Sequence, residues 1–118
     1  MEVETPLTAI DRLADLPEGW DSYEAPKIAE VSRELAKDCL SRVQRLLSQH
    51  YWNPLVGPTP EAGVALIWRK ATGSEVNVLF SAAGARYVVL SPTHQVVQRG
   101  HVDDCERFAL EVLKRLEL

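Results

Sequence analysis

Four short runs in the second half of the chain, each rich in β-branched and aromatic residues, constrain the fold most. Such residues are enriched in β-strands. The segments between the runs contain Gly, Ser or Pro and have the length of hairpin turns, which connect antiparallel neighbours. The pattern therefore predicts a four-stranded antiparallel β-meander with strands at Val64–Arg69, Glu75–Phe80, Ala85–Leu90 and Gln95–Arg99.

Helical periodicity precedes these runs. Thr5-Pro6 is typical of a helix start, because threonine caps unpaired backbone N–H groups and proline fits the first helical position. That helix should end at Leu16-Pro17-Glu18-Gly19. A second, longer helix is predicted from apolar residues at three- and four-residue steps, with Leu40 beside them: Ile28, Val31, Leu35, Cys39, Val43, Leu46 and Leu47. Residues 51–63 contain three prolines and two glycines, and are expected to form a semi-rigid connector.

A final helix is expected after the meander. Asp103 should cap it, with Glu106 three residues later completing an acidic variant of the capping box. Its apolar stripe would be Cys105, Phe108, Ala109, Val112, Leu113 and Leu116. Helices that pack on a meander lie on one of its faces. The predicted fold is therefore a single α+β domain over residues 1–118, with two N-terminal helices, a four-stranded antiparallel meander, a C-terminal helix and two-layer packing.

Charge is unevenly distributed along the chain, whose net charge is −4. Residues 1–24 hold seven acids and one base, whereas residues 25–118 hold ten acids and twelve bases. The overall balance argues against a nonspecific binder of nucleic acid or of anionic membranes. The acidic segment either serves solubility and helix N-termini or contacts a basic partner protein.

No long apolar segment and no signal-peptide pattern occur, so a cytoplasmic protein that is not inserted in a membrane is expected. The only cysteines, Cys39 and Cys105, are too few for a disulfide scaffold or a four-cysteine zinc site. Both lie on apolar helical stripes, and buried free thiols are the expected outcome.

Alternation along the strands separates two faces of the sheet. Residues such as Val64, Leu66, Trp68, Val76, Val78 and Phe80 form the better core face. The opposite face is mixed, with Ile67, Leu79 and either Val88 or Val89 as an apolar patch. This patch is either a set of scattered surface residues or a seam for a homodimer or a partner, with Arg69, Glu75 and Asn77 at its rim.

The N-terminal run Leu13-x-x-Leu16-Pro17-x-x-Trp20-Asp21-x-Tyr23-x-Ala25 resembles a motif of small bacterial and phage proteins of unassigned function. In that family a long helix, a Pro-rich loop, a Gly and a strand ending in Trp follow; here Pro58-Thr59-Pro60, Gly63 and Trp68 match them. Ser22 and Glu24 stand where the family has glycines, and Ile67 where an acid is common. The resemblance covers roughly residues 10–80 and implies no established activity.

The loop of this motif is the candidate partner-binding segment, with Trp20, Asp21, Tyr23 and Glu24 as its residues. Trp and Tyr next to acids make effective interface anchors. The alternative is that these residues fix the loop to the core, since large aromatic rings bury much area while offering one polar tip.

No phosphate-binding loop, dinucleotide fingerprint or metalloprotease helix occurs, and no cofactor or metal is expected. The favoured function is a non-enzymatic protein-interaction module of bacterial or phage origin, for example antitoxin- or immunity-like. One alternative is a nucleic-acid-binding module that uses Arg69, Arg86 and Arg99 with nearby aromatic rings. The other is a small enzyme with a site near His94 and His101, where Asp103 and Asp104 follow.

Overall fold

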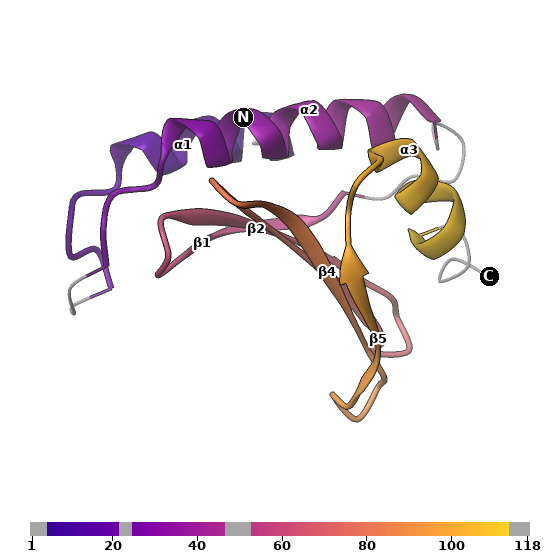
Figure 1. The fold of residues 1–118 in the computed structure, drawn as a ribbon. Coiled ribbons are helices and arrows are strands. Elements are labelled where there is room, and N and C mark those ends of the chain that lie inside the picture. Colours follow the sequence, from indigo (N-terminus) through magenta and orange to yellow (C-terminus); the bar gives the residue numbers. More distant parts are fainter. Residues whose placement is uncertain (1–4, 22–24, 47–52, 114–118) are drawn as a thin grey trace.

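The computed structural model describes residues 5–21, 25–46 and 53–113. It is an α+β fold with three α-helices and a five-stranded antiparallel sheet. Figure 1 shows α1 and α2 lying along one side of the sheet. The elements follow in the order α1 (Pro6–Arg12), a 3₁₀ turn (Leu13–Asp15), α2 (Glu30–Leu46), β1 (Leu55–Thr59), β2 (Gly63–Arg69), β3 (Glu75–Ser81), β4 (Gly84–Leu90), β5 (Val96–His101), α3 (Cys105–Phe108) and a π-helical turn (Ala109–Leu113).

The sheet is a meander in which each strand pairs with the next along the chain, in the order β1-β2-β3-β4-β5. The four predicted strands are present within two residues of their expected ends. The prediction of four strands was wrong by one, because the expected connector 51–63 contains β1. Leu55 to Thr59 pair with Ile67 to Gly63 of β2. Pro58 is tolerated there because β1 is an edge strand with one free side.

The free edges of the sheet are β1 and β5. Val96 and Val97 of β5 are 47% and 62% exposed. The pairing of β5 with β4 is irregular, with a register shift between Val89 and Leu90. Such a bulge bends and twists a strand locally.

Helix α1 begins as its sequence predicts. The Thr5 hydroxyl accepts a hydrogen bond from the Thr8 amide at 3.1 Å, and Pro6 occupies the first turn. Lys37 Nζ lies 2.9 Å from Asp11 Oδ1 and joins α1 to α2. This contact raises the pKa of Lys37, because the neighbouring carboxylate stabilises the ammonium group.

Helix α2 packs against β2 and β3 with a face that matches the predicted stripe at Cys39 and Val43, with Leu40 beside them, and departs from it nearer the helix start. Its buried residues, with Ile28 just before the helix, are Ser32, Ala36, Cys39, Leu40 and Val43. Val31, Leu35 and Leu46 of the predicted stripe are exposed, and Leu47 lies outside the described residues. Small Ser32 and Ala36 are buried in their place, and small side chains let a helix approach its neighbours closely.

The core lies between the sheet and the helices. Trp68, Phe80, Leu66, Val64, Val76 and Val78 are all at most 2% exposed, which confirms the predicted core face. They pack with Ile10 of α1 and with Leu40 and Val43 of α2 in one hydrophobic cluster.

Helix α3 has a different cap from the one predicted. Asp104, not Asp103, is the N-cap, and its Oδ1 accepts hydrogen bonds from the amides of Glu106 and Arg107 at 2.9 and 3.2 Å. The helix begins at Cys105, so an aspartate at position 103 is too early for that role. Phe108 contacts Tyr87 of β4 with ring centroids 5.3 Å apart. Phe108, Ala109 and Val112 are buried as predicted, whereas the Leu113 side chain and Leu116 lie outside the described residues.

Within the described residues, no helix combines the length and the apolar character that crossing a membrane requires.

Candidate functional site

The open face of the sheet, meaning the face opposite α1, α2 and α3, is not covered by a helix of the described residues (Figure 1). Strand register determines which side chains it presents, because successive residues of a strand point to opposite faces. One row across the five strands is Leu55, Ile67, Asn77, Val88 and Arg99. The register thus assigns Val88 to this face and leaves Val89, which is buried, in the core.

Apolar side chains surround Asn77 on the open face. Leu55 is 56% exposed, and Ile67, Leu79, Val88 and Leu90 are partly exposed. Leu79 lies in the next row along the strands, between Ala65 of β2 and Arg86 of β4. These side chains lie on β1 to β4, as the sequence indicated for Ile67, Leu79 and Val88. The prediction that Asn77 lies at the rim was wrong, because the register places it between Ile67 and Val88.

One end of the open face is basic. Arg86 pairs directly with His101 across β4 and β5, and Arg99 is the diagonal neighbour of Arg86. Both arginines are exposed, and neither has an ion-pair partner in the described part of the chain. A hollow of about 330 Å³ opens at this end, lined by Thr59, Glu61, Leu79, Phe80, Ser81, Ala83, Gly84, Ala85, Arg86 and His101.

The other end carries an ion pair. Arg69 Nη2 and Nε donate to Glu75 Oε1 at 2.8 and 3.1 Å, and His94 Nδ1 lies 3.7 Å from Glu75 Oε2. Glu75 is buried, at 6% exposure, so the guanidinium compensates a carboxylate that has lost most of its water. His94 adopts a φ of 64° in the β4–β5 turn, which places its ring beside Glu75.

The three arginines named for the nucleic-acid alternative do not form one strip. Arg86 and Arg99 are neighbours, whereas Arg69 lies at the opposite end and is engaged by Glu75. The aromatic rings expected beside them are on the other face: Trp68 is 1% exposed, and Tyr87 packs on Phe108. The prediction that aromatic rings lie beside these arginines, ready to stack on nucleic-acid bases, is therefore wrong.

The N-terminal loop shows the contacts of a segment fixed to the core. Trp20 is partly buried against the hydrophobic cluster, and its Nε1 donates to the Pro26 carbonyl at 3.3 Å. Asp21 Oδ1 accepts from the Ala25 amide at 3.4 Å. Tyr23 and Glu24, the other predicted partner-binding residues, lie outside the described residues.

The two histidines of the enzyme alternative do not converge. His94 precedes β5 and His101 ends it, so the length of the strand separates them. In the described ranges, no three His, Cys, Asp or Glu side chains form a group that could hold a metal ion.

A pair of thiols is the feature that sequence reasoning missed. Cys39 of α2 and Cys105 of α3 are hydrogen-bonded through their side chains, although 66 positions separate them in the chain. The hydrogen bond lowers the pKa of the Cys105 thiol, and it raises the pKa of Cys39, as burial also does. The only sequence signal was that each residue lies on an apolar face of a helix; nothing indicated that those two helices meet.

Comparison with known proteins found no matching family model, no matching curated protein and no matching solved structure.

Proposed function

We propose that this chain is a non-enzymatic protein-interaction module that binds a partner protein across the open face of its sheet. The observation that supports the proposal is the apolar patch of Leu55, Ile67, Leu79, Val88 and Leu90 on a face without a helix in the described residues. An apolar centre with a polar rim is the composition of protein interfaces. Apolar residues gathered on an uncovered surface are a mark of interaction sites.

The charge of the open face indicates the chemistry of the partner. Its strands carry Arg69, Arg86, Arg99 and His101 but only one carboxylate, Glu75, which is already paired with Arg69. A partner with an apolar patch and acidic residues beside it complements this surface, and such complementarity steers association. The basic partner predicted for the acidic N-terminal segment would use a different surface, and remains a second candidate for residues 20–24.

A second copy of the chain fits the open face less well. In a two-fold symmetric dimer the same patch occupies both sides of the interface. Few carboxylates on one copy could then pair with Arg86, Arg99 and His101 of the other, because Glu75 is already paired with Arg69 and, among the described residues, only Glu61 lies at the basic end. The homodimer therefore ranks below a distinct protein partner.

Nucleic acid also complements cationic side chains, but single-stranded binding relies on aromatic rings as well. None lies on the strands of the open face in the described residues, since Trp68 and Tyr87 point to the core. The resemblance of residues 13–25 to bacterial and phage proteins adds the proposal that the partner is a bacterial or phage protein whose activity this chain inhibits.

Photo-crosslinking tests the proposal directly. A benzophenone amino acid is placed at Val88 on the open face or, as a matched control, at Val31, which is 46% exposed on α2. After irradiation in cells of the native source, we expect a discrete protein adduct from position 88 and none from position 31. Arg86→Glu with Arg99→Glu should reduce the yield of that adduct, because both cations lie next to Val88.

The composition of the adduct decides between the alternatives. An adduct that is digested by nuclease, or one that contains only this chain, contradicts the proposal in favour of nucleic acid or of a homodimer. Equal adducts from both positions, or none from position 88, show that the open face is not the binding surface. Circular dichroism of each variant confirms that the fold is retained.

A further inference from the structure

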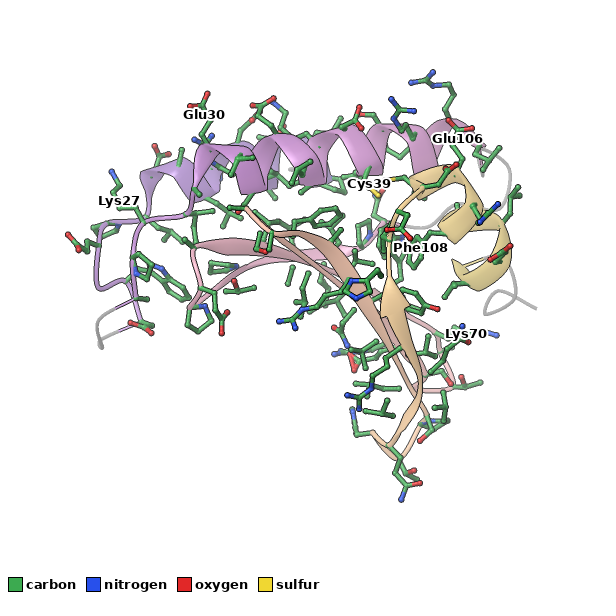
Figure 2. All side chains as sticks on the ribbon, viewed as in Figure 1. Lys27, Glu30, Cys39, Lys70, Glu106 and Phe108 are labelled. Carbon is green, nitrogen blue, oxygen red and sulfur yellow. The ribbon has the colours of Figure 1, made fainter. Side chains whose placement is uncertain are left out.

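Two cysteines from distant parts of the chain meet where α3 packs on α2. Cys39 lies on the side of α2 that faces α3, as Figure 2 shows, and is 1% exposed. Cys105 is partly exposed and lines a polar surface hollow of about 370 Å³, together with Asp38, Arg42, Asp103, Asp104 and Glu106. One thiol is thus accessible from solvent, and the other lies behind it.

The surrounding contacts hold the two helices in register. Arg42 donates to Asp38 on its own helix at 3.0 Å and to Glu106 of α3 at 3.4 Å. Phe108, one turn beyond Cys105, packs on Tyr87 of the sheet. Because α3 is fixed both to α2 and to β4, the thiol contact is part of a packed interface.

The electrostatic surroundings give the two sulfurs different roles. The hydrogen bond from Cys39 lowers the pKa of Cys105, with a smaller contribution from Arg42, against the opposing effects of burial, Asp38 and Asp104. A thiolate is the reactive form of cysteine. Cys105 is also the sulfur that solvent can reach, whereas Cys39 is 1% exposed, so Cys105 is the nucleophile and Cys39 the thiol behind it.

We propose that Cys39 and Cys105 are a redox pair, which a hydroperoxide oxidises to an intramolecular disulfide that links α2 to α3. The Cys105 thiolate attacks one peroxide oxygen; the O–O bond breaks, and the leaving alkoxide or hydroxide takes up a proton. This step gives a sulfenic acid at Cys105. The Cys39 sulfur then attacks Cys105 Sγ, the S–O bond breaks, and water leaves with the Cys39 proton. The peroxide is reduced by two electrons and the two thiols are oxidised by two.

Oxidation of the purified protein with hydrogen peroxide tests this proposal. At a stoichiometric dose we expect the intact mass to fall by two hydrogen atoms. Non-reducing peptide mapping should identify one linked pair that contains Cys39 and Cys105, and reducing agent should restore the original mass. In Cys39→Ala we expect the Cys105 sulfenic acid to accumulate, and to be trapped by dimedone. In Cys105→Ser we expect the buried Cys39 to stay reduced.

Retention of both thiols at that dose, oxidation of Cys105 to a sulfinic acid in the wild type, or disulfides only between chains would each overturn the proposal. The wild-type measurement needs no substitution, so a variant that fails to fold leaves the test intact.

Discussion

Gly63→Ala is expected to destabilise the protein strongly, because β2 leaves no room for a side chain at this position. A Cβ at Gly63 would lie 2.4 Å from the Phe80 carbonyl oxygen and 2.7 Å from Thr59 Oγ1. The first neighbour is backbone of β3, which cannot rotate away. The second is the hydroxyl that accepts a hydrogen bond from the Gly63 amide at 3.0 Å.

The expected cost follows from these two contacts. Overpacking of this kind costs about 1–3 kcal/mol, and loss of the Thr59 hydrogen bond costs about 1 kcal/mol more. For a chain of this length, each kcal/mol corresponds to about 4 °C in Tm. We therefore expect the free energy of unfolding to fall by about 2–4 kcal/mol, measured by urea denaturation and by thermal melting followed by circular dichroism.

Gly57→Ala is the matched control. Gly57 is a glycine of the same hairpin, opposite Ala65, and a Cβ there meets nothing within 4 Å. We expect this change to be neutral or to stabilise the protein by up to about 1 kcal/mol, because alanine restricts the unfolded chain. If Gly63→Ala were as well tolerated as Gly57→Ala, the close pairing of β1, β2 and β3 described above would be incorrect.

Three further substitutions test individual contacts. Ser32→Ala should raise the free energy of unfolding by about 1 kcal/mol. The buried Ser32 Oγ has no hydrogen-bond partner within the described ranges, and alanine favours the helix. A lower free energy of unfolding on urea denaturation would contradict this prediction. Trp20→Ala should lower the free energy of unfolding by about 2–3 kcal/mol, since the ring packs on the core. Trp20→Phe should lower it by only about 1 kcal/mol, for the lost hydrogen bond to Pro26. Unchanged stability in Trp20→Ala would favour the interpretation of Trp20 as an anchor for a partner protein. Cys39→Ala removes the hydrogen-bond donor that lowers the pKa of Cys105. The pH profile of Cys105 alkylation by iodoacetamide should therefore move to higher pH. A shift to lower pH would show that Cys39 does not lower this pKa.

The sequence predicted the secondary structure where local pattern decides it. The four hairpin-linked strands and the Thr5 cap were predicted correctly because alternation and capping are local properties. Strand β1 was missed because its stability comes from pairing with β2, which outweighs the composition of a Pro-rich segment. The buried face of α2 was predicted from hydrophobicity, whereas the tertiary packing selects small Ser32 and Ala36.

The candidate sites depend more on tertiary structure. Alternation in single strands indicated an apolar patch at Ile67 and Leu79, but only the register between strands separates Val88 from Val89. The contact between Cys39 and Cys105 depends on how α3 docks, and no local pattern encodes that.

The two edges of the meander differ in what they offer to another extended chain. At β1, Pro58 lacks an amide hydrogen and fixes its backbone angle, so this edge is a poor template for further pairing. At β5, two features hinder pairing with a further strand: the irregular register opposite Val89 and Leu90, and the charge of Arg99. Both features disfavour the addition of a further strand at either edge, which is the route by which open sheets grow into fibres.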